Sequence, residues 1–309
     1  MNGPILVGVD GGGTRSTLVV ADAQGRELAR AAGEAGLVDP RDPERSARII
    51  AGLARTALEQ AGLREVPDAI CAGLAGVGNE AERVAVHDAL QASGVARRVR
   101  VASDGEIALE GAFAGGPGIL LIAGTGSVAY GRAPDGRMER CGGWGMIVGD
   151  EGSGFALGRD GMKAALCSVD GREPRTVLLD AILTALDVDN PREVPPWAGR
   201  VPKSEIAALA RVVLDAAEQG DAVARRVVES AAGELARHVT ALAERLTPWS
   251  GEVPVVLHGG VLRSPLYASL VTRELSGDAR AFRVQPPRMD AVHGALRYAA
   301  ALVGEEVPV

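Results

Sequence analysis

The chain opens on Ile5-Leu-Val-Gly-Val-Asp-Gly-Gly-Gly-Thr14, a short apolar run that ends in a carboxylate and three glycines. The β-branched segment 16–21 follows at once, and a turn over 22–25 leads into a further apolar segment over 27–31. Alternation of this kind predicts strand, tight turn, strand, turn and strand, which is a three-stranded antiparallel meander. A Rossmann fold needs a helix directly after the glycines, so the opening excludes that fold.

Helical patterns and short apolar runs alternate after the meander. Asp42 and Pro43 form an N-cap and first-turn pair, and the apolar spacing that follows predicts a helix that stops at Gly62. Apolar runs at 69–72 and 99–102 flank a helical pattern at 80–92. Parallel strands joined by crossover helices have this order. The first half of the chain is therefore predicted to be α/β.

The segment from residue 118 resembles the opening of the chain. A predicted strand over 118–123 ends in Gly124-Thr-Gly-Ser127, and strands are expected over 128–132 and 137–141. Apolar residues at every third or fourth position then predict one long helix over 223–246, a strand over 253–257 and a helix after Pro265. A last helix over 290–302 has Asp290 as its cap. Two α/β halves, each beginning with a meander and a glycine turn, are expected.

Composition limits the classes of function. The chain has 309 residues, enough for about two domains, and 47% of them are hydrophobic and 24% charged, as in a folded globular protein. The net charge of −7 and the lack of a long basic run argue against nucleic-acid and anionic-membrane partners. No apolar run of 18 residues predicts a membrane span. The 41 glycines are nearly twice the usual share of about 7%, so many must serve backbone geometry.

Cysteine usage and the start of the chain suggest a compartment. Cys71, Cys141 and Cys167 form no CxxC pair and have no histidine at zinc-finger spacing, so the sequence signals neither a disulfide framework nor a metal cluster. The chain enters its first strand without the pattern of a signal peptide. A reducing cytoplasm fits both observations.

Two glycine turns are candidate phosphate sites. After Asp10, three residues without a Cβ let backbone N–H groups approach a phosphate, while the carboxylate can face a metal ion bound to that phosphate. The alternative is a plain hairpin turn. The second turn, 124–127, adds hydroxyl groups that can donate to phosphate oxygens. Facing one another across a cleft, the two turns would hold a polyphosphate from both sides.

Asp104 is a candidate general base. It follows the predicted strand 99–102 where a helix begins, and functional side chains in open α/β sheets commonly occupy such strand ends. A carboxylate there can accept the proton of a hydroxyl group. The alternative is a helix N-cap, for which Ser103 or Asp104 would serve equally well.

A glycine-rich segment over 142–154 combines adjacent acids, Asp150 and Glu151, with one of three tryptophans, Trp144. Carboxylates bind vicinal hydroxyl groups and an aromatic face packs on a sugar ring, so a sugar site is the functional interpretation. A hinge loop with a core tryptophan is the alternative. The segment 257–261 is a strand end that could carry a base or ribose on glycine backbone. His87, His238 and His293 lack partner acids at ligand spacing and are interpreted as ordinary surface or core histidines.

Taken together, these motifs resemble the actin-like ATPase and sugar-kinase superfamily, and within it the N-acetylglucosamine kinase branch of the BadF/BadG/BcrA/BcrD group. The resemblance spans nearly the whole chain. It rests on the segments Gly8-Val-Asp-Gly-Gly-Gly-Thr14, Ser103-Asp104, Ile122-Ala-Gly-Thr-Gly-Ser127, Gly142-Gly-Trp-Gly145, Gly149-Asp-Glu-Gly-Ser153 and His258-Gly-Gly-Val261.

The resemblance implies a fold and a set of residue roles. The fold would be α/β, with two related actin-like (ribonuclease H-like) domains and a nucleotide cleft between them: residues 1–116, completed by the C-terminal helix 290–309, and residues 117–289. Asp104 matches the catalytic base of the family and Asp10 its magnesium-side carboxylate. The two phosphate loops of the family match Gly11, Gly12, Gly13 and Thr14, and Gly124, Thr125 and Gly126. Its adenosine segment matches Gly259, Gly260 and Val261. Its sugar-binding positions match Ser127, Gly143, Trp144, Gly145 and Asp150.

The implied activity is the ATP- and Mg²⁺-dependent phosphorylation of the primary hydroxyl of an amino sugar, N-acetylglucosamine or glucosamine, in the cytoplasm. Two departures from the family bear on the sugar: residues 33–39 contain no Asn, and Val128 follows the second phosphate turn where some relatives have Asn. Another hexose such as N-acetylmuramic acid therefore stays open as the acceptor, and so does assembly into a homodimer.

Two rival classes use the same fold. The first is an activator ATPase of a 2-hydroxyacyl-CoA dehydratase or benzoyl-CoA reductase type system, which holds an iron–sulfur cluster through cysteines that are not arranged for it here. The second is a sugar-binding regulator, which would need a DNA-reading module that the acidic charge balance disfavours.

Overall fold

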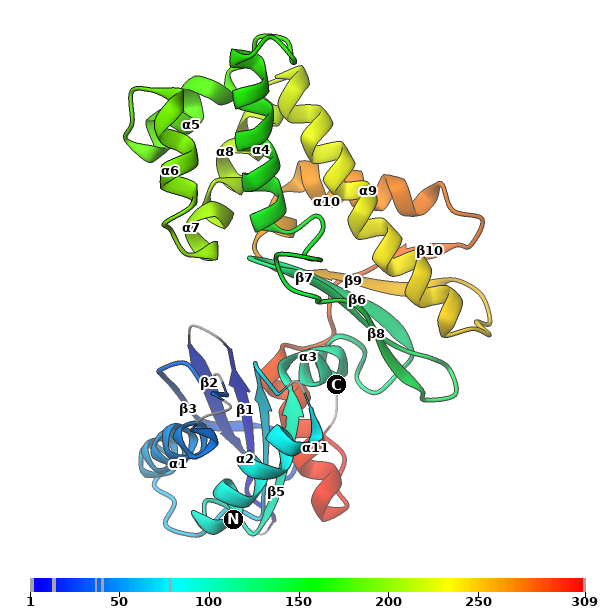
Figure 1. Cartoon of the computed structure of the whole chain (residues 1–309). Helices are drawn as coiled ribbons and strands as arrows, with labels where there is room; N and C mark the ends of the chain where they lie inside the picture. Colours follow the sequence, from blue (N-terminus) through cyan, green and yellow to red (C-terminus); the bar gives the residue numbers. More distant parts are fainter. Residues whose placement is uncertain (1–2, 13–14, 37, 40–41, 78, 308–309) are drawn as a thin grey trace. The chain divides into compact units, whose positions relative to one another are not determined.

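The computed structural model describes residues 3–12, 15–36, 38–39, 42–77 and 79–307. The chain divides into two compact units, residues 1–116 with 287–309 and residues 117–286, whose elements are labelled in Figure 1. Residues 287–289, which the sequence-based division assigned to the second domain, lie in the first unit. There the N–H groups of Arg288 and Met289 donate to the carbonyls of Ala112 and Gly111, at 3.1 and 3.0 Å.

The first unit contains a five-stranded sheet. Its order is β3-β2-β1-β4-β5, made of β1 (Leu6–Gly11), β2 (Ser16–Ala21), β3 (Glu27–Gly33), β4 (Ala69–Leu74) and β5 (Arg98–Ser103). β1, β2 and β3 pair antiparallel, whereas β4 and β5 continue the sheet parallel to β1. The predicted meander and the predicted parallel strands are both confirmed.

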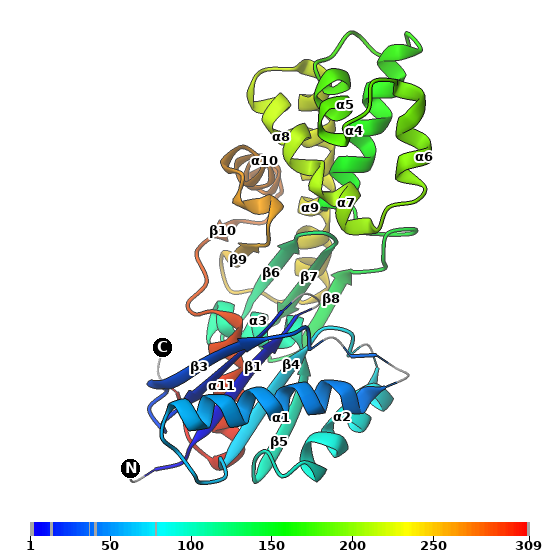
Figure 2. The ribbon, with the colours of Figure 1, turned by 90° about the vertical axis from the view of Figure 1, so that its left-hand side faces the viewer.

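Helices cover both faces of this sheet (Figure 2). α1 (Pro43–Gln60) and α2 (Glu80–Ala92) lie on one face, and α3 (Asp104–Phe113) and α11 (Ala291–Val303) on the other. Val7 and Val9 pack in the core under α1 and α2, and Leu6 packs in the core under α11. Successive side chains of a strand point to opposite faces, so one buried strand supplies both cores.

The helix starts follow the predicted caps. The Asp42 carboxylate accepts a hydrogen bond from the backbone N–H of Arg45, with Pro43 in the first turn. Asn79 and Glu82 form a reciprocal capping box at the start of α2. Side-chain acceptors at these places satisfy N–H groups that have no partner inside the helix, which fixes where each helix begins.

The second unit repeats the sheet of the first. Its order is β10-β9-β6-β7-β8, made of β6 (Gly118–Ala123), β7 (Ser127–Arg132), β8 (Met138–Gly142), β9 (Val253–His258) and β10 (Phe282–Val284). β6, β7 and β8 form an antiparallel meander, and β9 and β10 lie parallel to β6 on its other side. The two sheets therefore share one topology, which confirms the predicted internal repeat and the α/β fold class.

The helices of the second unit were predicted only in part. The expected long helix is α9 (Ala222–Arg245), and the helix after Pro265 is α10 (Pro265–Ser276). Residues 154–218 form a further helical group that was not predicted from the sequence: α4 (Gly154–Val169), α5 (Leu178–Leu186), α6 (Val194–Ala198), α7 (Lys203–Ala208) and α8 (Ala210–Glu218). α4 carries glycines on its packed face, and a Cβ at Gly158 would lie 2.0 Å from the Ile206 carbonyl oxygen. Close helix packing requires glycine here, although glycine disfavours a helix in the sequence.

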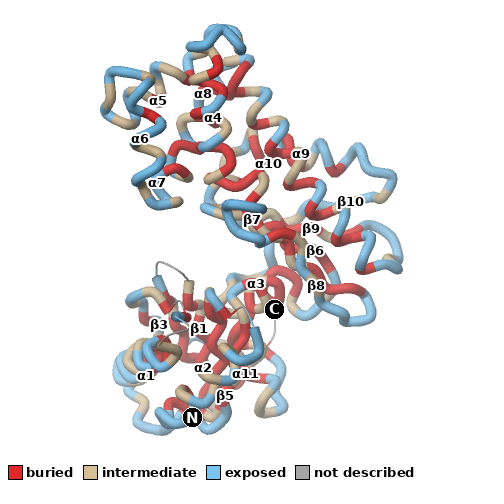
Figure 3. The backbone as a smooth tube through the Cα atoms, in the orientation of Figure 1, coloured by how far each residue is buried: buried red, intermediate tan, exposed pale blue. Residues whose placement is uncertain are grey.

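Buried residues concentrate in the strands and on the inner faces of the helices (Figure 3). Tyr267 is the largest fully buried side chain, and its hydroxyl donates to the Gly152 carbonyl at 2.6 Å. That bond ties the loop before α4 to α10. Within the described part of the chain, every helix is too short or too polar to cross a membrane.

Candidate active site

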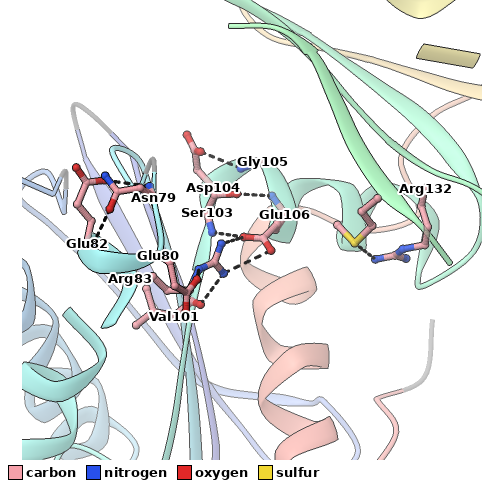
Figure 4. Close-up of polar contacts among 11 residues, drawn as sticks. Asn79, Glu80, Glu82, Arg83, Val101, Ser103, Asp104, Gly105, Glu106 and Arg132 are labelled. Carbon is pink, nitrogen blue, oxygen red and sulfur yellow. Dashed lines mark hydrogen bonds and ion pairs between the residues drawn. The ribbon is translucent and has the colours of Figure 1, made fainter. Parts of the chain in front are cut away.

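Asp104 stands at the first turn of α3 and Ser103 caps that helix. The Ser103 hydroxyl accepts from the Glu106 N–H at 3.1 Å, and Glu106 Oε2 accepts from the Ser103 N–H at 2.6 Å. Arg83 pairs with Glu106 at 3.2 Å. In Figure 4 the Asp104 carboxylate points away from this cluster. The capping alternative therefore belongs to Ser103, and Asp104 is left accessible to a ligand.

Two carboxylates of the first unit have raised pKa values. Partial desolvation by the surrounding protein raises the pKa of Asp104, although its side chain is accessible from solvent, and the Gly105 N–H donates to it at 2.9 Å. Burial raises the pKa of Asp10 to about 6, and the negative charges of Asp104 and Asp290 add to the shift, against a smaller opposing effect of Arg15. The negative charges of Asp104 and Asp290 thus act on the partly buried carboxylate of Asp10, where a bound cation would relieve the repulsion.

Asp290 is a member of this acidic group that the sequence presented only as a helix cap. It does cap α11, accepting from the His293 N–H at 3.0 Å. Its Oδ1 also lies 2.5 Å from His293 Nδ1, and His293 Nε2 lies 3.3 Å from Glu27 Oε1. The prediction that His293 lacks partner acids was wrong. Asp290 is only three residues from His293, so this neighbour could have been recognised from the sequence. Glu27 lies near His293 because α11 packs on the first sheet, and local spacing does not reveal that contact.

The other two histidines also have acidic neighbours. His238 Nε2 lies 3.5 Å from Glu151 Oε2, and His87 Nδ1 lies 3.0 Å from Asp88 Oδ1. His238 is buried and packs under the glycine-rich segment, because a Cβ at Gly142 would lie 2.7 Å from its Nε2. His238 is therefore a core histidine, as predicted. The prediction that it has no partner acid was wrong, because Glu151 lies beside it.

The first glycine turn is described in part. Gly11 is the last residue of β1, and the Gly12 N–H donates to the Arg15 carbonyl at 3.1 Å. Gly13 and Thr14 lie outside the described residues. The turn joins two antiparallel strands, as expected, and it begins directly after Asp10.

Asp150 organises the candidate sugar loop of the second unit. Its side chain is only 5% exposed; Oδ1 accepts from the Ser127 N–H at 3.1 Å and Oδ2 from Lys203 Nζ at 2.5 Å. The Ser127 hydroxyl donates to the Glu151 carbonyl at 2.7 Å. Asp150 has φ +60°, a left-handed conformation that is uncommon outside glycine and that local contacts must hold. Ser127 and Asp150 are thus brought together as a rigid pair.

Lys203 was missed because it lies in the helical group over 154–218, which was not predicted from the sequence. It is the first residue of α7 and comes to Asp150 from 53 positions away. One signal was available: Lys163 and Lys203 are the only lysines among 33 basic residues. Lysine is thus rare in this chain, and its ammonium is a more compact cation than the guanidinium of arginine.

The segment 143–145 offers an aromatic face to solvent. Trp144 is 66% exposed, so the interpretation as a core tryptophan was wrong. Its ring lies 5.4 Å from the guanidinium carbon of Arg140, and the Gly143 N–H donates to the Ser127 carbonyl at 3.1 Å. Gly143 and Gly145 both have positive φ. An exposed aromatic ring tied to the Ser127 backbone can pack against the apolar face of a sugar.

A cavity of about 750 Å³ in the second unit adjoins the second glycine turn. Gly124 and Thr125 line it together with Gly260 and Val261, so the predicted phosphate and adenosine segments share one cavity. The rest of the wall is formed mainly by α7, α8 and the start of α10: Ser204, Ala207, Ala208, Ala210, Arg211, Leu214, Asp215, Glu218, Arg263 and Ser264. A cavity of this size, with both apolar and polar or charged lining residues, is large enough for a small-molecule ligand.

Gly259 has a structural role beside this cavity. It has φ +110°, and a Cβ there would lie 2.2 Å from the Ala123 carbonyl oxygen. Only glycine lets β9 end this close to β6 before the chain turns toward the cavity. Gly126 is similarly constrained, since its Cβ would lie 2.5 Å from Asp150 Oδ1.

The described residues contain no group of three His, Cys, Asp or Glu side chains able to hold a metal ion by themselves. Magnesium seldom uses such an all-protein site. It keeps several waters and binds through one or two carboxylates together with substrate phosphates. Asp10, whose carboxylate is partly buried at the end of β1 beside the glycine turn, fits that mode of binding.

Comparison with known proteins places the chain in one family. The model of the BadF/BadG/BcrA/BcrD ATPase family matches residues 7–299. An N-acetylmuramic acid/N-acetylglucosamine kinase of Clostridium acetobutylicum is 35% identical over 265 residues, which cover 85% of this chain and 87% of that protein. A glucosamine kinase of Vibrio cholerae is 27% identical, covering 95% of each.

A solved structure agrees with these relatives. A protein of Chromobacterium violaceum assigned as an N-acetylglucosamine kinase superposes with a TM-score of 0.76 at 31% identity, covering 95% of this chain and 98% of that one. The family match extends over both units and over every motif from the first glycine turn to the last helix. The chain belongs to the BadF/BadG/BcrA/BcrD ATPase family.

Proposed function

We propose that this chain is an ATP-dependent kinase that phosphorylates the primary hydroxyl of an amino sugar, N-acetylglucosamine or glucosamine. One observation carries the proposal: the turn 124–126 borders both a nucleoside-sized cavity and the buried carboxylate of Asp150. A phosphate donor in that cavity and a hydroxyl-rich acceptor at Asp150 would therefore be neighbours. The names of the relatives, which are kinases of amino sugars, support the same activity.

The second unit would bind both substrates. The base and ribose would lie in the cavity against Gly260 and Val261, and the phosphates would lie on Gly124, Thr125 and Gly126. Asp150, held by Ser127 and Lys203, would accept hydrogen bonds from sugar hydroxyls. Gly143, Trp144 and Gly145 would cover the face of the sugar ring.

The first unit would supply the base. Asp104 would accept the proton of the primary hydroxyl as its oxygen forms a bond to the γ-phosphorus, and the bond between that phosphorus and the ADP oxygen breaks. The products are the sugar phosphate and ADP, with the proton on Asp104. A carboxylate with a raised pKa is better matched to this task than an ordinary one.

Asp10 would bind the magnesium ion that accompanies the nucleotide, on the phosphate side of the first glycine turn. Mg²⁺ supplies neutralisation of charge on the transferring phosphoryl group when it is bound. Gly11, Gly12, Gly13 and Thr14 would contact the phosphates from the side of that turn.

The alternative as an activator ATPase is not favoured. Such an activator needs accessible thiolates to hold its cluster. Cys71 lies in the core of the first unit on β4, where burial raises its thiol pKa to about 12, and Cys167 is buried on α4. Free thiols and the use of ATP suit a cytoplasmic enzyme, and we include that location in the proposal.

The test is release of ADP from Mg²⁺-ATP with N-acetylglucosamine, glucosamine, N-acetylmuramic acid, N-acetylmannosamine and glucose, beside a reaction without sugar. We expect an amino sugar to raise the rate well above that of the reaction without sugar. An ATPase rate that no sugar changes, in protein that carries iron, would instead assign the activator function.

A further inference from the structure

Lys203 brings an ammonium group to the point where the candidate phosphate turn and the candidate sugar loop meet. Its Nζ lies 2.5 Å from Asp150 Oδ2. A Cβ at Gly126 would lie 3.0 Å from the same Nζ and 2.5 Å from Asp150 Oδ1. The ammonium therefore lies directly over the backbone of the turn and against the loop carboxylate at the same time.

The helix that carries Lys203 is also a wall of the nucleotide cavity. Ser204, Ala207 and Ala208 of α7 line that cavity opposite Gly124 and Thr125 of the turn. A nucleotide that fills the cavity would contact the same short helix that holds Lys203. Lys203 itself is not part of the cavity wall, but it directly precedes Ser204, which is.

The ammonium has donors to spare. An ammonium has three N–H groups, and the hydrogen bond to Asp150 uses one of them. The Lys203 side chain is 29% exposed, whereas that of Asp150 is 5% exposed. The Lys203 Nζ also lies 5.9 Å from the centroid of the Phe155 ring. The cation is the more exposed partner of the ion pair and is the one that could receive an anion.

The choice of lysine supports a role beyond neutralising Asp150. The chain meets nearly all of its needs for positive charge with arginine, and keeps lysine only at positions 163 and 203. The backbone of Gly126 lies close to Lys203 Nζ, which favours a compact ammonium over a wide, planar guanidinium. A point charge over a glycine turn is a common way to bind phosphate.

We propose that Lys203 is a phosphate-binding residue of this kinase, which donates to the β- and γ-phosphate oxygens of ATP while it retains one hydrogen bond to Asp150. This inference rests on the proposed function above. Lys203 would link the two substrates, because the cation that fixes the sugar-binding carboxylate is also the one that contacts the donor phosphates. If Lys203 is only the counter-ion of Asp150, its loss will weaken the binding of sugar and leave that of ATP unchanged.

The test compares Lys203→Met and Lys203→Arg with the wild-type chain in binding titrations with adenosine, AMP, ADP and ATP at constant Mg²⁺. We expect Lys203→Met to lower the affinity for ATP by about 10- to 100-fold, as for the loss of a charged hydrogen bond, and to leave the affinity for adenosine within about threefold. Lys203→Arg should recover part of the affinity for ATP. The matched control is Lys163→Met. Lys163 is the second lysine of the chain and lies on the exposed side of α4, so this variant should bind ATP as the wild type does.

A double variant separates phosphate binding from misfolding. Lys203→Met leaves Asp150 as a buried carboxylate without its cation, which could disturb the loop. Lys203→Met/Asp150→Asn removes that unpaired charge. The quantity to compare is the ratio of the affinity for ATP to that for adenosine. If this ratio is 10- to 100-fold lower in the double variant than in the wild type, Lys203 binds phosphate. Recovery of wild-type ATP affinity in the double variant overturns the proposal.

The proposal and the function on which it rests fail in different ways. A wild-type chain that prefers ATP over adenosine but phosphorylates no sugar of the panel contradicts the proposed function, and the titrations with Lys203→Met still decide the role of Lys203. A wild-type chain that binds ATP no better than adenosine contradicts both.

Discussion

Ser103 and Asp104 are adjacent but have different tasks. The Ser103–Glu106 capping box holds the start of α3, so Asp104 is not needed to cap the helix. We predict that Asp104→Asn lowers kcat for the sugar by about 10²- to 10⁴-fold and leaves the melting temperature close to that of the wild type, because a positioned base is lost while the cap remains. Kinetics with the preferred sugar and thermal unfolding measure the two effects.

The control for Asp104→Asn is the loss of a cap elsewhere in the same unit. Asn79→Ala removes the cap of α2 and should lower stability by about 1 kcal/mol without a comparable loss of kcat. If Asp104→Asn retains kcat within a few-fold, Asp104 is not the base.

The raised pKa of Asp10 predicts that the stability of the chain falls as the pH rises. The pKa of Asp10 in the folded chain, about 6, lies above the ordinary value of 3.8. Folding therefore favours the protonated form: the contribution to stability is complete below pH 3.8 and is lost as the pH rises through about 6. We predict that Asp10→Asn, measured by denaturant unfolding without Mg²⁺, is more stable than the wild type at pH 8 by about 2–3 kcal/mol, with no such gain near pH 3.8.

An exposed aspartate serves as the control for this effect. Asp135 lies in an exposed turn, where hydrogen bonds from Arg137 lower its pKa. Asp135→Asn should therefore give no gain in stability at pH 8. Equal stability of Asp10→Asn and the wild type at pH 8 would show that Asp10 is not desolvated in the way described.

The sequence identified some site residues and missed others for a physical reason. Asp10 and Asp104 directly follow strands, and the end of a buried strand is a place that local pattern reveals. Within the second unit Lys203 is brought to Asp150, and within the first unit Asp290 is brought near Asp10, by packing between segments that are far apart in the chain. Such contacts depend on the tertiary fold, so only indirect signals, such as the rarity of lysine, could have pointed to them.

At the scale of elements, glycine marks where helices touch. In α11, a Cβ at Gly294 would lie 2.0 Å from the Ile107 carbonyl oxygen and 2.6 Å from the Gly111 backbone nitrogen. We predict that Gly294→Ala destabilises the first unit by about 1–3 kcal/mol, despite the better helix propensity of alanine, because the added methyl group separates α11 from α3. Denaturant unfolding of the full chain measures this loss.

Gly233 is the matched helical glycine. It lies in α9, and a Cβ there would meet nothing within 4 Å. Gly233→Ala should therefore stabilise the second unit by about 0.5–1 kcal/mol, the ordinary difference in propensity. If Gly294→Ala also raised the stability, the packing at Gly294 would be looser than these distances indicate.

Elements with strong local signals were predicted well. The strands over 16–21 and 118–123, the helix over 80–92 and the cap of α1 lie where alternation, apolar spacing and turn residues placed them. The helices over 154–218 were not predicted. The packed face of α4 is largely glycine and alanine, which weakens its apolar periodicity. α5 and α8 bury larger apolar residues, and their spacing could have been recognised. Close packing of small residues is therefore the part of this fold that local sequence reveals least.

The whole molecule repeats one sheet topology, and each copy has its own core. The core of the second unit is built from residues 119–282, and the cavity of about 750 Å³ is lined by residues of the same unit. We predict that the fragment 117–286 folds alone and binds adenosine with an affinity close to that of the full chain, but phosphorylates no sugar, because Asp104 is missing. Calorimetric titration with adenosine and the assay for ADP release test both statements.

The fragment 1–116 is the control, and we expect it to behave differently. Its sheet lacks α11, which buries Leu6 and Val19 together with Leu296 and Ala299. Without that helix, one apolar face of the sheet is open to water, so the fragment should aggregate or remain unfolded. A stable, monomeric fragment 1–116 would contradict this account of the core.

The return of α11 to the first unit also bears on biosynthesis. A ribosome releases the chain from its first residue to its last, so the first half emerges early, but one face of its sheet stays uncovered until α11 has been made. The second unit, which is continuous in the chain, can mature before it. During translation the first unit would therefore expose an apolar face for longer than the second unit does. We expect the first unit to depend on chaperones more than the second.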